Sequence, residues 1–267
     1  RHHMKPLNRS IVGGLIFFAV GLPFLQLVIW SFSNRWFYPG LLPQQWGWRA
    51  WQYVFDTAGA QIVGAIGQSL AVATVTAVIA LLIGLPAGRA LGLYAFKGKD
   101  VISVILILPV IVPPLCVSMG LHHWFIRLGL AESFSGVVLV HLTFCLPYTV
   151  FVLWGIFSNY NPEFEDQARS LGASTTGIVL RVMLPMTLPG LVVAALFSFL
   201  LSWSQYLATL IIGGGKITTL PIILFALMTS GDRPVAAAVS LVFVAPAFLA
   251  LLFSARYMGR QSMVGIW

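Results

Sequence analysis

Six long runs of uncharged, mainly apolar residues constrain this chain more than any other feature. They lie between successive charged residues and hold 25, 32, 26, 30, 34 and 22 residues: 10–34, 57–88, 101–126, 133–162, 182–215 and 234–255. A helix that crosses a bilayer needs about 20 predominantly apolar residues. Only 8% of the chain is charged, whereas a soluble domain carries about 25%. We therefore expect an all-α membrane protein with six transmembrane helices, which excludes the soluble and disordered classes.

The spans themselves are expected near the centres of these runs. Their approximate ranges are 11–32, 65–90, 101–125, 135–158, 185–211 and 235–256. A further uncharged stretch, 217–231, holds only 15 residues and contains Pro221. It is too short to span comfortably, so we expect an interfacial or re-entrant helix there.

The basic residues predict the orientation. With six spans both termini lie on one side, and the loops on that side hold ten of the 15 Lys and Arg residues. Cytoplasmic loops carry the excess of Lys and Arg. We therefore expect a multi-pass protein of a bacterial-type inner (cytoplasmic) membrane with both termini in the cytoplasm. The net charge of +8 suits loops that face anionic lipid, and no basic surface indicates nucleic-acid binding.

Three segments follow from this pattern. Residues 1–3 are expected to be the remnant of a purification tag. Residues 4–60 hold the first span and an outer loop with several tryptophans: Trp36, Trp46, Trp48 and Trp51. An interfacial aromatic belt is the expected role of this loop, and stacking on a substrate is the alternative. Residues 61–260 hold the other five spans as one membrane domain.

Uncharged polar residues interrupt the fourth and fifth spans. They are His141, Thr143, Ser202, Ser204, Gln205 and Tyr206. Such residues either bond neighbouring helices or line a path through the membrane. No Asp, Glu or Lys lies inside the six spans, which disfavours an ion-coupled transporter. We expect neither catalytic residues nor a metal site, because no His, Cys or acid set has ligand spacing. Cys116 and Cys145 fall inside apolar runs and are expected to be buried thiols.

The loop between the fourth and fifth spans is unusually well specified, over residues 161–185. Asn161 and Pro162 predict a helix start, and three acidic residues follow in its first turn. Gly172 can adopt the left-handed conformation that ends a helix. Ser174 or Thr175 can cap a second helix that stops before Pro185. We therefore expect two short helices that meet at a glycine corner.

This loop resembles the signature of the MetI-like family, the inner-membrane permease subunits of binding-protein-dependent ABC importers. That signature reads Glu-Ala-Ala, three residues, Gly, nine residues, Ile, one residue, Leu-Pro. Asp166-Gln167-Ala168, Gly172, Val182 and Leu184-Pro185 stand at these positions. The second and third spans add to the resemblance, through 68–88 and 108–114, and it looks closest to the branch that imports polyamines, iron, thiamine and phosphonates.

The resemblance implies a MetI-like permease domain over 61–260, whose cytoplasmic loop, 159–184, forms a coupling helix. The expected ATPase-coupling residues are Glu165, Asp166, Gln167, Ala168, Arg169, Leu171, Gly172 and Ala173. The chain would be no enzyme itself: it has no phosphate-binding loop, so ATP and Mg²⁺ would be bound by a separate ABC ATPase dimer. Further implied partners are a second permease, the same or homologous, and an extracytoplasmic solute-binding protein.

The six polar residues of spans four and five are then candidates for the translocation path of a small solute. In many members of the family an acid stands where Gln205 lies here, which argues against a polycationic solute. The alternative function is a stand-alone secondary transporter or channel. A membrane enzyme is disfavoured, because no nucleophile and base are paired.

Overall fold

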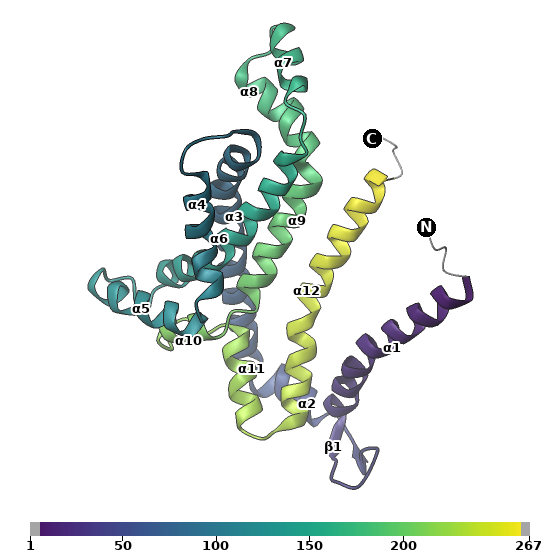
Figure 1. Ribbon diagram of the computed structural model, residues 1–267. Coiled ribbons are helices and arrows are strands. Elements are labelled where there is room, and N and C mark those ends of the chain that lie inside the picture. Colours follow the sequence, from purple (N-terminus) through teal and green to yellow (C-terminus); the bar gives the residue numbers. More distant parts are fainter. Residues whose placement is uncertain (1–5, 263–267) are drawn as a thin grey trace. The chain divides into compact units, whose positions relative to one another are not determined.

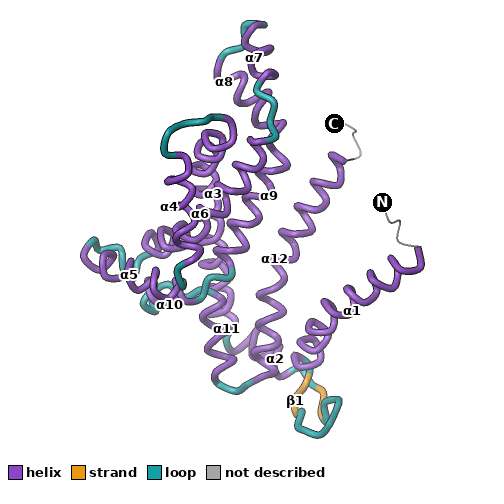
Figure 2. The backbone as a smooth tube through the Cα atoms, in the orientation of Figure 1, coloured by secondary structure: helices purple, strands orange, loops and turns teal. Residues whose placement is uncertain are grey.

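The computed structural model describes residues 6–262, and most of them are helical (Figures 1 and 2). The expected tag remnant, 1–3, lies outside the described residues. The chain forms two compact units. Unit 1 joins the chain up to Gly64 with Ile223–Pro246, and unit 2 joins Ala65–Ile222 with the chain from Ala247 onward.

Unit 1 begins with the helix α1 (Pro6–Ser31) and a small hairpin. The hairpin strands β1 (Ser33–Arg35) and β2 (Gln45–Trp46) are antiparallel. The Gln44 side chain closes the loop between them, because it bonds both the N–H and the carbonyl of Phe37 at 3.0 Å. The short helix α2 (Arg49–Gln52) follows and runs into a π-helical turn, Tyr53–Thr57. Unit 1 also contains the larger part of α11 (Leu220–Thr229) and the first half of α12 (Arg233–Ser262).

Unit 2 is a helical bundle. Its elements are most of α3 (Gly59–Leu93), α4 (Lys99–Ile111), α5 (Pro114–Arg127), α6 (Phe134–Ser158), α7 (Glu163–Ser170), α8 (Thr175–Ile178), α9 (Leu184–Trp203) and α10 (Leu207–Gly213), with the start of α11 and the second half of α12. α6 and α9 lie side by side along their lengths (Figure 1). Val137, Val140 and Phe144 of α6 form the core with Ala208 and Ile212 of α10.

Glycines let α3 approach α6 closely. A β-carbon at Gly84 would stand 2.8 Å from Thr149, and one at Gly88 would stand 2.5 Å from the β-carbon of Leu153. Gly92 continues this face one turn further on, against Phe157. The spacing of four residues puts the three glycines on one face of the helix. The Gly-x-x-x-Gly spacing of 84 and 88 therefore serves close helix packing.

Four described helices are long and apolar enough to cross a membrane: Gly59–Leu93, Phe134–Ser158, Thr175–Trp203 and Arg233–Leu252. A fifth crossing arises if α4 and α5 together count as one span. The stretch expected to be interfacial or re-entrant, 217–231, contains the ten-residue helix α11.

Two spans depart from the sequence expectation. The third was expected to be one helix over 101–125, but α4 and α5 are bent by 102° at a short break. Pro113 and Pro114 cause the break, because proline disfavours a helical conformation in the residue before it. Val112 and Pro113 accordingly have ψ angles of 134° and 131°. The fifth was expected to run to residue 211, but α9 ends at Trp203 and α10 begins at Leu207.

Candidate functional site

The loop after α6 folds into two short helices that meet at a glycine. The helix α7 begins at Glu163, one residue later than expected, and the Asn161 side chain accepts a bond from the Glu163 N–H at 3.0 Å. Gly172 has φ +84°, the left-handed conformation that favours glycine. Ser174 caps the second helix by accepting a bond from the Gly177 N–H at 3.2 Å. The corner predicted from the sequence is therefore confirmed.

The end of the second helix was predicted wrongly. It does not stop before Pro185, because the helix continues through a π-helical turn, Val179–Met183, directly into α9. Thr175–Trp203 is therefore a single helical stretch of 29 residues. Proline lacks an N–H and its ring clashes with the carbonyl four residues earlier. A π turn lies just before Pro185, and local adjustments of this kind let a helix accommodate a proline.

A buried ion pair ties this loop to α3. Both guanidinium NH groups of Arg89 donate to the two carboxylate oxygens of Glu165, each at 2.8 Å. The side chain of Glu165 is only 7% exposed and that of Arg89 is 25% exposed. The Arg89 guanidinium holds the pKa of the Glu165 carboxyl below its ordinary value. Arg89 also lies 2.7 Å from the sulfur of Met183, so it contacts both ends of the loop.

The ion pair lines a cleft of about 330 Å³ between α3 and the two loop helices. Leu85 and Pro86 of α3 form one wall, and Thr175 and Ile178 of α8 form another. Arg89 and Glu165 are 76 positions apart in the sequence. Arg89 lies near the end of α3, inside the range expected to form the second span, 65–90. A single arginine in an otherwise uncharged helix was the signal that could have pointed to an acidic partner.

The other face of the loop is open to solvent. Asp166 and Arg169 pair there at 2.6 Å with side chains 70% and 60% exposed, and Leu171 is 89% exposed. Gln167, Gly172 and Ala173 are also exposed, whereas Ala168 is half-buried. Seven of the eight expected coupling residues are thus at least partly accessible, and the eighth, Glu165, points inward.

The polar residues of spans four and five fall into two groups. His141 is buried between α9 and α10, and its two ring nitrogens bond Ser202 Oγ and Thr209 Oγ1, each at 2.8 Å. Ser202 is buried as well. By contrast, Ser204 is exposed, and Thr143, Gln205 and Tyr206 are half-buried. His141 therefore links the two sides of the helix break, Ser204, Gln205 and Tyr206 form the break itself, and Thr143 lies on α6. Among residues 6–262, no cluster of three His, Cys, Asp or Glu side chains could hold a metal ion.

Comparison with known proteins agrees with this architecture. Residues 80–261 match the family described as "Binding-protein-dependent transport system inner membrane component". The spermidine/putrescine transport system permease protein PotC of Haemophilus influenzae is 26% identical over 241 residues, which cover 90% of this chain and 92% of the relative. The inner membrane ABC transporter permease protein YcjP of Escherichia coli is 27% identical, over 88% of this chain and 86% of the relative.

A solved structure shares the fold. One chain of a bacterial ABC transporter involved in the import of the acidic polysaccharide alginate superposes with a TM-score of 0.71 at 18% identity. The superposition covers 96% of this chain and 99% of that chain. The present chain therefore belongs to the family of binding-protein-dependent transport system inner membrane components. It is a multi-pass inner-membrane permease subunit of an ABC importer and has the MetI-like fold.

Proposed function

We propose that this permease couples to a separate ABC ATPase dimer through the loop 159–184. The observation that carries the proposal is the Arg89–Glu165 pair, which fastens α7 to the end of α3. A loop that transmits a displacement must not bend at its root. Two charge-assisted hydrogen bonds in a bidentate arrangement supply both strength and a defined angle.

The opposite face of the loop would contact the ATPase. Asp166, Arg169 and Leu171 are exposed there and combine charge with an apolar side chain. ATP and Mg²⁺ would be bound by the ATPase subunits, and closure of their dimer would pull the loop. Because the second loop helix continues through Val179–Met183 into α9, this movement would reach the membrane bundle through two helices, α3 and α9.

The solute path would lie beside the break between α9 and α10. The residues that would face this path are Ser204, Gln205, Tyr206 and Thr143. The hydrogen bond between His141 and Ser202 would hold the end of α9 in place. An unwound helix at membrane depth is tolerated only where it is buried in protein or lines a water-filled cavity. Gln205 carries no charge, which suits a small solute other than a polycation.

The complete assembly would contain a second permease, the same or homologous, and an extracytoplasmic binding protein that delivers the solute. In this chain six spans would cross the inner membrane, with α1 as the first and the bent pair α4–α5 as the third. Both termini would then lie in the cytoplasm. Residues 4–60 would form an N-terminal span with its outer loop, and 61–260 the permease domain.

The test compares two glycines that have the same backbone strain. Gly172 has φ +84° and Gly98 has φ +92°, and a β-carbon at either position would meet no atom within 4 Å. Replacing Gly172 with leucine should release the ATPase during co-purification and uncouple ATP hydrolysis, whereas Gly98→Leu, outside the coupling loop, should not. Retention of the ATPase by the Gly172 variant would contradict the coupling role. Solute movement in liposomes that contain this chain alone would favour a stand-alone transporter or channel.

A further inference from the structure

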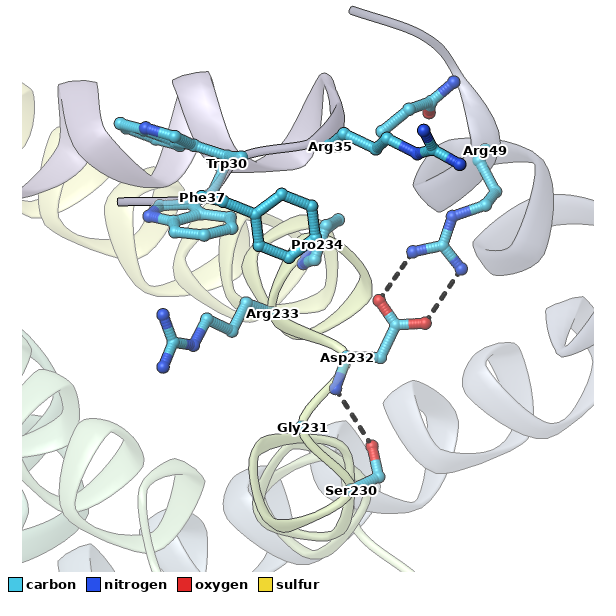
Figure 3. A pocket seen from close by; sticks show the side chains of 11 residues that line it. Trp30, Arg35, Phe37, Arg49, Ser230, Gly231, Asp232, Arg233 and Pro234 are labelled. Carbon is cyan, nitrogen blue, oxygen red and sulfur yellow. Dashed lines mark hydrogen bonds and ion pairs between the residues drawn. The ribbon is translucent and has the colours of Figure 1, made fainter. Parts of the chain in front are cut away.

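Unit 1 contains an open pocket of about 600 Å³ that the coupling mechanism does not use (Figure 3). Three segments line it: the end of α1 with the first hairpin strand, the start of α2, and the turn that leads into α12. Each segment contributes one arginine, and these are Arg35, Arg49 and Arg233. Trp30, Trp36 and Phe37 provide aromatic walls. We refer to it as the arginine pocket.

The arginine pocket has more positive than negative charge. Asp232 is its one carboxylate, and both oxygens accept bonds from Arg49 at 2.8 and 2.9 Å (Figure 3). The Arg49 guanidinium lowers the pKa of Asp232, so the carboxylate is charged at neutral pH. Among the described residues, neither Arg35 nor Arg233 forms an ion pair with a carboxylate. Arg233 instead lies over the Trp30 ring, 5.6 Å from its centroid.

This combination is typical of a protein-binding site. Arginine and the large aromatic residues are enriched at the energetic centres of interfaces. The planar guanidinium recognises carboxylates in a bidentate manner, and a guanidinium that already rests on an indole loses little freedom when it binds. The hairpin exposes apolar side chains at and beyond the edge of the pocket. Phe37, which lines the pocket, is 68% exposed, and Tyr38 and Leu41 beyond it are 98% and 92% exposed.

We propose that the arginine pocket receives acidic side chains of the extracytoplasmic binding protein, whose carboxylates bind Arg35 and Arg233 separately while its surface covers the hairpin. The inference rests on the proposed function, because the topology with both termini in the cytoplasm places the end of α1 and the start of α12 outside.

The arginines and the exposed hairpin loop together favour a protein over an anionic lipid headgroup as the occupant. Lipid phosphates would bind the arginines but would leave Tyr38 and Leu41 uncovered, since both residues belong to the loop beyond the first strand. A protein surface can satisfy both, because a standard interface covers roughly 800 Å² on each partner and combines an apolar centre with a polar rim. The unpaired positive charge would also steer an acidic partner toward the pocket.

The test uses the complete transporter in native membranes. The photo-cross-linker p-benzoylphenylalanine replaces Leu41, whose side chain is exposed and lies outside the pocket. Irradiation should link the chain to a solute-binding protein, and the linked peptide should contain Asp or Glu. The double variant R35E/R233E should lower the yield by roughly tenfold or more, because like charges then face each other. R35Q/R233Q removes the two charges without reversing them and should lower the cross-linking yield less. This milder variant serves as a check that misfolding does not cause the loss.

The control is R127E. Arg127 is exposed, belongs to unit 2, is expected on the same side of the membrane and lies over Trp124 at 5.8 Å. R127E therefore makes the same kind of charge reversal at one arginine that also rests on an indole but lies outside the pocket. Its yield should match that of the unchanged chain. Replacing the acidic residue in the partner's linked peptide with arginine should abolish the cross-link. Combining that replacement with R35E/R233E should restore the cross-link.

Three outcomes would overturn the proposal: a yield that R35E/R233E leaves unchanged, a link to lipid alone, or no linked protein. An ATPase assay of the same membranes separates the two ideas. If the ATPase still co-purifies and is coupled while no link forms, only the pocket assignment fails. If the ATPase does not associate, the proposed function fails as well.

Discussion

The Arg89–Glu165 pair offers the sharpest test of how the coupling loop is held. Arg89→Met removes two charge-assisted hydrogen bonds and leaves a carboxylate, 7% exposed, without its partner. Breaking a buried ion pair from one side costs about 3–5 kcal/mol. The Arg89 side chain is 25% exposed, so water can replace part of the loss, and we expect about 2–3 kcal/mol. The population in which α7 is detached should then rise roughly 30- to 160-fold.

Hydrogen exchange measures this population directly. The backbone amides of α7 (Glu163–Ser170) should exchange faster in Arg89→Met by a similar factor, because exchange follows the free energy of local opening. Arg169→Met is the matched control, since it removes an ion pair from the exposed face of the same helix. Exposed pairs contribute about 0–1 kcal/mol, so its exchange should change less than fivefold. Equal exchange in the two variants would refute the claim that the buried pair anchors the loop.

The remaining predictions concern pH, packing and the helix break. The pKa of Glu165 is below its ordinary value of 4.5. The ion pair therefore stabilises the docked loop fully above pH 4.5, and this stabilisation is lost as the pH falls through the lower pKa of the folded state. Amide protection of α7 should be constant between pH 8 and 6, and loss of protection in that range would contradict the assignment. Gly88→Ala should destabilise the fold, because its β-carbon would stand 2.5 Å from the β-carbon of Leu153 in α6, whereas a β-carbon in Gly67→Ala would meet no atom within 4 Å; size-exclusion profiles in detergent should separate the two. His141→Ala should lower the free energy of unfolding by about 1–2 kcal/mol, since two buried hydrogen bonds are lost, one of them to Ser202; an unchanged melting temperature would show that the bonds contribute nothing.

Several parts of the structure followed from local sequence signals. The apolar runs are long enough to predict helices wherever they occur, because in a bilayer a helix satisfies every backbone group within its own segment. The corner at Gly172 was predictable for a similar reason, since few residues other than glycine tolerate a φ of +84°. The bonds of the Asn161 and Ser174 side chains were predictable as well, because they reach backbone groups only two or three residues away.

Prolines showed the limit of such signals. Pro113 with Pro114 bends the third span by 102°, whereas Pro185 lies within a continuous helix. The same residue type ends one helix and not the other. What differs is the backbone before each proline: Leu184 is helical and follows a π turn, whereas Val112 and Pro113 are extended.

The class of protein, most of the helices and the glycine corner could thus be predicted from the sequence, because each depends on residues within a few turns of one another. Which side chains meet became visible only in the folded chain. Arg89 finds Glu165 76 positions away, His141 bonds Ser202 across two helices, and Arg49 pairs with Asp232 183 positions away. The sequence around a charged or hydroxyl side chain does not indicate which distant residue will bond it. Its partner is selected when helices pack and each buried polar group must be satisfied.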